Sequence, residues 1–230
     1  NPQEKPMPIT VYNISGAPRG WRVLVGLELK GLDYKVQHLS ASDGEHKQPA
    51  FLNINPRGTV PALTTETITL CDSIAILAWL DREYPHNLLF GETPQEAAEI
   101  WQLTLDCCDY LRAAMHKIMW PYLILNADLP QEQSPEFNAL QTAGKTLIAE
   151  YQRLDRLLDG RQYFCAERAT AAEAIIYPEF KQLLRAVDRR NDVMAAIGIL
   201  PVTEQFPRLA AWCERVSGLK GISKTQPYHW

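Results

Sequence analysis

The stretch that decides the fold runs from residue 53 to residue 63 and reads NINPRGTVPAL. Pro56-Arg57-Gly58 predicts a turn, because proline presets φ and glycine tolerates a positive φ. Val60-Pro61 then enters a short apolar run, where proline cannot donate to a sheet ladder. An X-Pro bond at such a bend is a candidate for the cis isomer, which would leave the N–H and C=O groups of Val60 unpaired and pointing outward.

A short strand and the start of a helix follow this bend. Residues 67–70 alternate between polar and apolar types, as a half-buried strand does. Asp72-Ser73 then precedes an apolar stripe with helical spacing, formed by Ile74, Leu77, Ala78 and Leu80. Either residue alone is an ordinary helix N-cap. Free main-chain groups, a carboxylate and a hydroxyl at a helix N-terminus together favour an extended peptide that carries an amine and a carboxylate.

These two segments carry a resemblance to a known family. NPRGTVPAL (residues 55–63) followed by CDSIAILAWLDREYP (residues 71–85) resembles the glutathione-binding half of a cytosolic glutathione transferase. The resemblance implies that the backbone of Val60, just before Pro61, pairs with the cysteinyl part of glutathione. It also implies that Asp72 and Ser73 hold the γ-glutamyl end, although the family more often has Glu where this chain has Asp72.

The resemblance implies a fold of two parts. We expect an α/β thioredoxin-like domain over residues 1–85, a linker over 86–93 and an all-helical domain over 94–230. Strand and helix patterns over residues 9–14, 21–30 and 34–38, with a short helix near Pro49, fit the order β-α-β-α-β-β-α. In the second half, Thr93 and Thr170 each precede a Glu three residues later, which predicts a capping box at two helix starts.

Composition excludes several classes of protein. The 230 residues have a net charge of −4, and Lys and Arg never cluster beyond a dipeptide, which argues against nucleic-acid binding. No apolar run approaches the roughly 20 residues needed to span a bilayer. Residues 1–6 are polar and predict no signal peptide. The five cysteines have no metal-ligand spacing, so we expect no metal site and buried thiols in a reducing cytoplasm.

Thiol activation is where this chain departs from the family pattern. A free thiol has a pKa of about 8.5, and lowering it to about 6.5 needs roughly 2.7 kcal/mol of stabilisation. The resemblance implies a Ser, Tyr or Cys just before the first helix, but the phi-, zeta- and omega-type positions fall on Ala17. Three alternatives remain open as the activating group: the Ser15 hydroxyl, the charge of Arg19, or backbone N–H groups alone.

Two further sets of residues follow from the resemblance. His46 and Lys47, in the run GEHK, are implied to meet the glycine carboxylate of glutathione, and a cation suits that group. The electrophile pocket is expected near the end of the helix after the linker. Its candidates are large apolar side chains: Met115, Met119, Trp120 and Tyr122.

The leading functional hypothesis is therefore a transferase of detoxification that adds glutathione, its co-substrate, to a small hydrophobic electrophile. The family pairs its protomers, so a homodimer is expected. An alternative is a glutathione-binding regulatory or scaffold protein with little catalysis, which the missing hydroxyl at Ala17 supports. A thiol–disulfide reductase of the omega or lambda type ranks last, because residues 15–22 contain no cysteine.

Overall fold

The computed structural model describes residues 8–230, and this part of the chain forms two compact units. One unit joins the described residues up to Glu92 with the segment Leu219–Trp230, and the other spans Thr93–Gly218. The sequence assigned residues 219–230 to the helical domain, and the structure instead packs them with the first unit. The expectation that residues 1–6 are no signal peptide lies outside the described residues.

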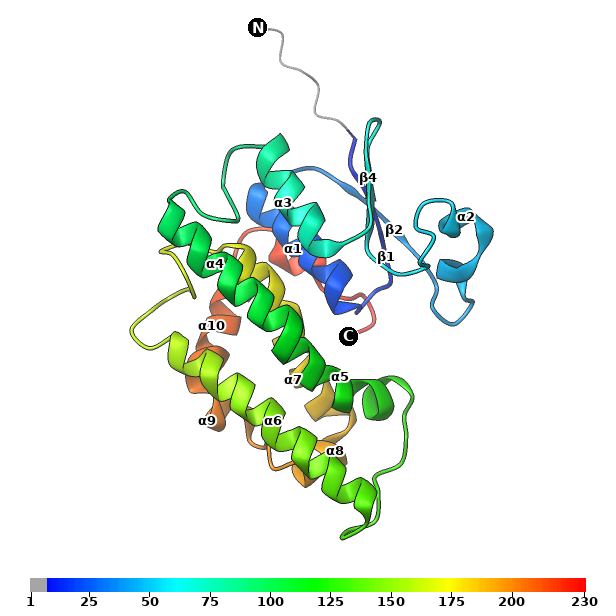
Figure 1. The fold of residues 1–230 in the computed structure, drawn as a ribbon, viewed down its shortest axis with the longest axis vertical. Helices are drawn as coiled ribbons and strands as arrows, with labels where there is room; N and C mark the ends of the chain where they lie inside the picture. Colours follow the sequence, from blue (N-terminus) through cyan, green and yellow to red (C-terminus); the bar gives the residue numbers. More distant parts are fainter. Residues whose placement is uncertain (1–7) are drawn as a thin grey trace, which may run out of the picture. The chain divides into compact units, whose positions relative to one another are not determined.

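A four-stranded mixed sheet forms the centre of the first unit (Figure 1). Its strands are β1 (Thr10–Asn13), β2 (Lys35–His38), β3 (Ala62–Thr64) and β4 (Thr69–Leu70), in the order β2-β1-β3-β4. β1 runs parallel to β2 and antiparallel to β3, and β3 pairs antiparallel with β4. The sheet confirms the thioredoxin-like arrangement.

Two long helices, α1 (Pro18–Lys30) and α3 (Ser73–Glu83), cover one face of the sheet, and the short α2 (Pro49–Leu52) lies beyond the other (Figure 1). α1 and α3 approach closely at Gly26, where a Cβ atom would lie 2.2 Å from Cδ2 of Leu77. α1 ends at Gly31, whose φ of 68° is the left-handed conformation expected of a C-cap glycine. Helix α1 begins three residues earlier than the pattern predicted, because Pro18 opens it.

A buried ion pair fixes the linker to the first unit. The Lys30 ammonium donates to the Asp81 carboxylate at 2.9 Å and to the His86 carbonyl at 2.8 Å. The same carboxylate accepts hydrogen bonds from the N–H groups of Leu89 and Phe90, both at 2.8 Å. The linker is therefore held by specific contacts, because a buried pair is stable only when its remaining polar sites are satisfied.

The second unit is helical, as predicted. Its helices are α4 (Pro94–Asp106), α5 (Arg112–Ile118), α6 (Pro135–Leu157), α7 (Ala171–Arg189), α8 (Asn191–Ala196), α9 (Val202–Gln205) and α10 (Pro207–Ser217). Two π-helical segments, η2 (Cys107–Leu111) and η3 (Met119–Ile124), flank α5. Over residues 8–230, no helix combines the length and apolar character that crossing a membrane requires.

The start of α7 shows the predicted capping box in full. The Thr170 side chain accepts from the N–H of Ala172, and the Glu173 carboxylate accepts from the Thr170 N–H at 2.8 Å. Glu173 also accepts from the N–H of Phe164 at 2.9 Å and lies within 3.4 Å of the Trp212 indole nitrogen. Burial raises the pKa of this carboxyl despite the hydrogen bonds. Thr170 and Glu173 therefore form a complete cap.

Candidate functional site

The bend before Pro61 is organised by a side chain to which the sequence assigned no role. Asn55 is buried, and its amide donates to the Thr59 carbonyl at 2.6 Å. Its side-chain oxygen accepts from the N–H of Arg57 at 3.1 Å. Gly58 completes the turn with a φ of 57°. Asn55 therefore holds both ends of the turn that leads into Val60-Pro61.

Val60 presents unpaired main-chain groups, which is the central expectation for a peptide receptor. The Val60–Pro61 peptide bond is cis. β3 pairs with β1 from Ala62 onward, so the ladder begins just beyond this point. Within residues 8–230, the N–H and C=O groups of Val60 make no hydrogen bond. Main-chain polar groups in this state favour pairing with an added extended chain.

The second element of the site is the short 3₁₀ helix η1 (Glu45–Lys47). The Lys47 ammonium donates to the Gly58 carbonyl at 2.8 Å, which fixes η1 against the turn. A Cβ atom on Gly58 would lie 2.8 Å from the His46 carbonyl oxygen, so this close packing requires glycine. The Nδ1 atom of His46 is buried and has no hydrogen-bond partner among the described residues. His46 and Lys47 thus lie beside the segment that leads to Val60.

The third element is the start of α3. Asp72 caps this helix, and its carboxylate accepts from the N–H groups of Ile74 and Ala75 at 2.9 and 3.1 Å. Asp72 remains exposed, whereas Ser73 is buried at the first helical position. The Cys71 thiol donates to the Ile54 carbonyl at 3.4 Å, which ties the residue before the cap to the segment that enters the turn. The structure therefore brings η1, the turn and the α3 start into one region.

The fourth element is the loop before α1. Ala17 occupies the N-cap position in an extended conformation, and no side chain caps the helix. Within residues 8–230, the N–H groups of Arg19 and Gly20 make no hydrogen bond. The Arg19 side chain is exposed and forms no ion pair with any described residue. This helix start carries uncompensated positive potential, which favours an anion or a thiolate.

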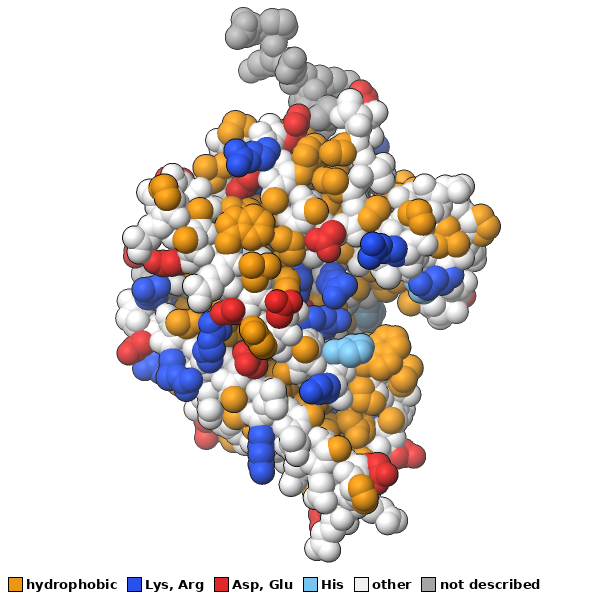
Figure 2. All heavy atoms as spheres, viewed as in Figure 1, with side chains coloured by type: hydrophobic (Ala, Val, Ile, Leu, Met, Phe, Trp, Pro, Cys, Tyr) orange, Lys and Arg blue, Asp and Glu red, His pale blue; other side chains and the backbone are white. Residues whose placement is uncertain are grey.

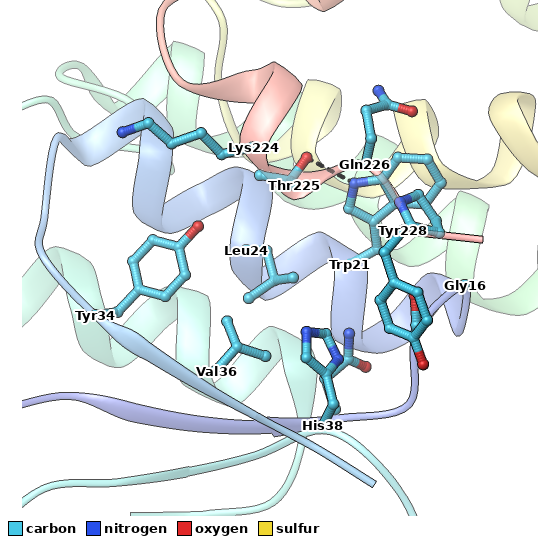
Figure 3. Close-up of a pocket in the computed structure, with 13 residues that line it drawn as sticks. Gly16, Trp21, Leu24, Tyr34, Val36, His38, Lys224, Thr225, Gln226 and Tyr228 are labelled. Atoms are coloured by element: carbon cyan, nitrogen blue, oxygen red, sulfur yellow. Dashed lines mark hydrogen bonds between the residues drawn. The ribbon is translucent and has the colours of Figure 1, made fainter. Parts of the chain in front are cut away.

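Ser15, the other candidate side chain of this loop, lines a cavity. Its hydroxyl oxygen is buried and has no hydrogen-bond partner among residues 8–230. Ser15 lines a partly open cavity of about 150 Å³ that is bordered by α1, β2 and residues 224–228. Figure 3 shows this cavity with Leu24, Val36 and His38 on one side and Thr225 on the other. The hydroxyl is therefore covered by neighbouring atoms and borders this cavity.

The four electrophile-pocket candidates separate into two pairs. Met115 and Met119 are buried in the helical unit, and the Met115 sulfur accepts from the Tyr151 hydroxyl at 3.3 Å. They are core side chains, which differs from the expectation, because Met and aromatic residues at helical spacing also fill cores. Trp120 is 49% exposed and Tyr122 is half-buried, so these two remain candidates.

Three of the five cysteines are not placed for thiol chemistry. Burial raises the pKa of the Cys71 and Cys213 thiols, the second to about 11, and that of Cys165 to about 12. Elevated pKa values keep a thiol protonated and unreactive near neutral pH.

Within residues 8–230, no group of three or more His, Cys, Asp or Glu side chains is arranged to hold a metal ion. Acidic and basic side chains are interspersed on the face drawn in Figure 2.

Sequence reasoning missed three contributors to this region. Asn55 and Cys71 lie inside the quoted segments, and asparagine in a turn is a recognised signal for a side chain that bonds its own backbone. The segment 228–230 also reaches the loop before α1, since a Cβ atom on Gly16 would lie 3.1 Å from the Trp230 indole nitrogen. No local sequence pattern predicts that contact, because it joins residues more than 200 positions apart.

Comparison with known proteins agrees with the resemblance. A family profile described as "Glutathione S-transferase, N-terminal domain" matches residues 17–83. Glutathione S-transferase Z2 of Arabidopsis thaliana is 33% identical over 208 residues, covering 90% of this chain and 85% of that protein. Glutathione S-transferase 1 of Dianthus caryophyllus is 27% identical over 221 residues, covering 94% and 96%. The crystal structure of a glutathione S-transferase from the Antarctic clam Laternula elliptica superposes with a TM-score of 0.80 at 23% identity, covering 96% and 93%.

Proposed function

Because the chain belongs to the glutathione S-transferase family, we propose that it binds glutathione as a thiolate and adds it to a small hydrophobic electrophile. The observation that carries this proposal is the pair of unpaired main-chain groups at Val60, beside the bend that Asn55 holds. Glutathione is an extended tripeptide, and its cysteinyl N–H and C=O groups complement those of Val60.

The two charged ends of the tripeptide have separate partners in this proposal. Asp72 is exposed at the α3 start and keeps acceptor capacity for the γ-glutamyl amine, with the Ser73 hydroxyl beside it. Lys47 and His46 receive the glycine carboxylate from η1. The Lys47 ammonium already donates one hydrogen bond to the Gly58 carbonyl. It therefore attracts the glycine carboxylate by its charge and by a hydrogen bond from one of its remaining N–H groups.

The sulfur then belongs at the uncapped start of α1. The unpaired N–H groups of Arg19 and Gly20 and the Arg19 guanidinium favour the thiolate over the thiol. The buried Ser15 hydroxyl contributes less, because reaching the sulfur would require the loop to turn it outward. Trp120 and Tyr122 are the side chains we assign to the electrophile, since both keep exposed aromatic surface.

A homodimer in the cytoplasm completes the proposal. Trp101 and Leu105 are 36% and 54% exposed and lie four residues apart on α4, so they share one helix face. Two adjacent exposed apolar side chains favour burial against a second copy. Cys71, Cys165 and Cys213 are thiols rather than disulfides, which supports a reducing compartment.

The test is ultraviolet titration of glutathione bound to the purified protein, followed by turnover of 1-chloro-2,4-dinitrobenzene. We expect thiolate absorbance to persist below neutral pH and the electrophile to be consumed. The alternative function, a binding module with little catalysis, is favoured by the alanine at position 17. Calorimetric binding of glutathione with neither thiolate absorbance nor turnover would support that alternative.

A further inference from the structure

The segment Leu219–Trp230 is anchored firmly on the first unit. Thr225 accepts a hydrogen bond from the Trp21 indole at 2.7 Å, the interaction dashed in Figure 3. Trp230 meets the same buried indole edge-on at a centroid distance of 5.2 Å. Tyr228 meets His38 edge-on at 5.4 Å. Contacts on both sides of residue 229 therefore define where its side chain lies.

His229 lies against the loop that precedes α1. A Cβ atom built on Gly16 would be 3.3 Å from Cε1 and 3.4 Å from Nε2 of His229, so this edge of the imidazole faces the loop. Gly16 has a φ of 84°, a conformation that itself favours glycine. Any side chain at position 16 would press on the imidazole. His229 is otherwise exposed, so a bound molecule has access to the ring.

The loop lacks a group that can accept a proton. Ala17 offers none, Arg19 is a donor only, and the Ser15 hydroxyl is buried away from solvent. Of the two side chains that approach Gly16, the Trp230 indole is also a donor only. The imidazole of His229 is thus a proton acceptor that lies directly against this loop, whereas His38 lines the cavity behind it, and histidine is well suited to that task near neutral pH.

We infer that His229 is the general base that removes the proton from the thiol of bound glutathione. The S–H bond breaks, its electron pair stays on sulfur, and the proton joins an imidazole nitrogen to give imidazolium, which later releases it to water. The positive α1 start and Arg19 then stabilise the thiolate that remains. This inference rests on the proposed function, because it takes glutathione to be the bound thiol.

The test compares the wild type with His229→Gln, which keeps the polarity of the side chain but accepts no proton. We expect the ultraviolet titration midpoint of bound glutathione to rise by about one pH unit or more. We also expect kcat for 1-chloro-2,4-dinitrobenzene to fall about tenfold or more, with KM for glutathione little changed. S-methylglutathione has no thiol proton, so its Kd should be the same in both proteins.

Two further variants make the result specific. His86→Gln changes an exposed imidazole in the linker and should leave the titration and kcat as in the wild type. His229→Gly removes the side chain, and free imidazole added to this variant should restore part of kcat. Rescue of this kind indicates proton transfer, because a purely structural loss is not repaired by a small base.

Three results would overturn the inference. An unchanged thiol titration in His229→Gln would do so while the proposed function stands. Weakened S-methylglutathione binding in that variant would assign His229 to holding the tripeptide instead. If the wild type binds neither glutathione nor S-methylglutathione, the proposed function and the inference fail together.

Discussion

The starts of α7 and α1 are both helix N-termini, but the first is fully capped and the second has no side-chain cap. At α7, Thr170 and Glu173 are fully buried and satisfy one another and the neighbouring N–H groups of Ala172 and Phe164. At α1, Ala17 provides no cap, and the N–H group of Arg19 makes no hydrogen bond within residues 8–230. The N–H groups at the start of α7 are satisfied by neighbouring residues, whereas the N–H group of Arg19 at the start of α1 is left for a group from outside this part of the chain.

This difference separates stability from function. A buried helix start without partners would cost the desolvation of several N–H groups, so α7 has to be capped by its own chain. An accessible helix start can stay open, because water or a ligand satisfies it, and its positive potential is then available to an anion. The start of α3 is intermediate: Asp72 caps it yet remains exposed.

The largest expected effect is at α7. Glu173→Ala should lower the free energy of unfolding by about 3 kcal/mol, because several buried donors lose their acceptor at once. Urea denaturation measures this loss. Glu214→Ala, at an exposed position of α10, is the matched control and should change stability by less than about 0.5 kcal/mol. Equal losses of unfolding free energy in both variants would show that the buried capping box stabilises the fold no more than an exposed Glu does.

The next effect is at the intermediate helix start, where capping and binding can be separated. Asp72→Ala should cost about 1 kcal/mol of stability, and Asp72→Asn should cost little, since Asn caps helices as well as Asp does. Both should weaken glutathione binding about tenfold, because the negative charge opposite the γ-glutamyl amine is lost. Calorimetry and thermal unfolding report the two quantities. Normal affinity in Asp72→Asn would remove Asp72 from the binding site.

A cap can also be added where α1 lacks one. Ala17→Asp should raise the free energy of unfolding by about 1 kcal/mol, because Ala17 already has the extended backbone of an N-cap residue. The same carboxylate should suppress the thiolate absorbance of bound glutathione. Ala17→Ser is the control that caps without a charge and should keep the absorbance. Retained absorbance in Ala17→Asp would place the sulfur away from this helix start.

Arg19 and Ser15, at the start of α1 and in the loop before it, should contribute unequally to kcat/KM. Arg19→Ala should weaken the thiolate absorbance and lower kcat/KM about fivefold, since an exposed charge contributes about 1 kcal/mol. Ser15→Ala should change kcat/KM by less than about twofold, because its hydroxyl is buried where it borders the cavity beside β2. The reverse order would identify Ser15 as the activating side chain.

A last prediction concerns pH. Burial raises the pKa of Glu173 in the folded protein above its unfolded value, so its favourable contribution is present while it is protonated and is lost as the pH rises through the folded pKa. Glu173→Gln does not titrate. The stability of the wild type relative to this variant should therefore decline as the pH rises above about 4.3. A difference that grows with pH would contradict the raised pKa.

Local sequence determined much of this protein. The turn residues around Pro56, the capping pair Thr170 and Glu173 and the C-cap Gly31 each act through neighbours within a few positions, so their roles were predictable from spacing. The bend and the helix start within residues 55–63 and 71–85 follow from short-range chemistry, whereas the two-part fold and the family were inferred from the resemblance that these residues carry.

Other features were decided only by the tertiary structure. Whether Met115 lines a pocket or fills the core depends on α6, and whether Ser15 faces a ligand depends on how the loop turns. The position of His229 depends on its approach to Gly16 and on the contacts that Thr225 and Trp230 make with Trp21, far away in the sequence. Periodicity records which face of an element is apolar, but it carries no information about which distant segment packs there.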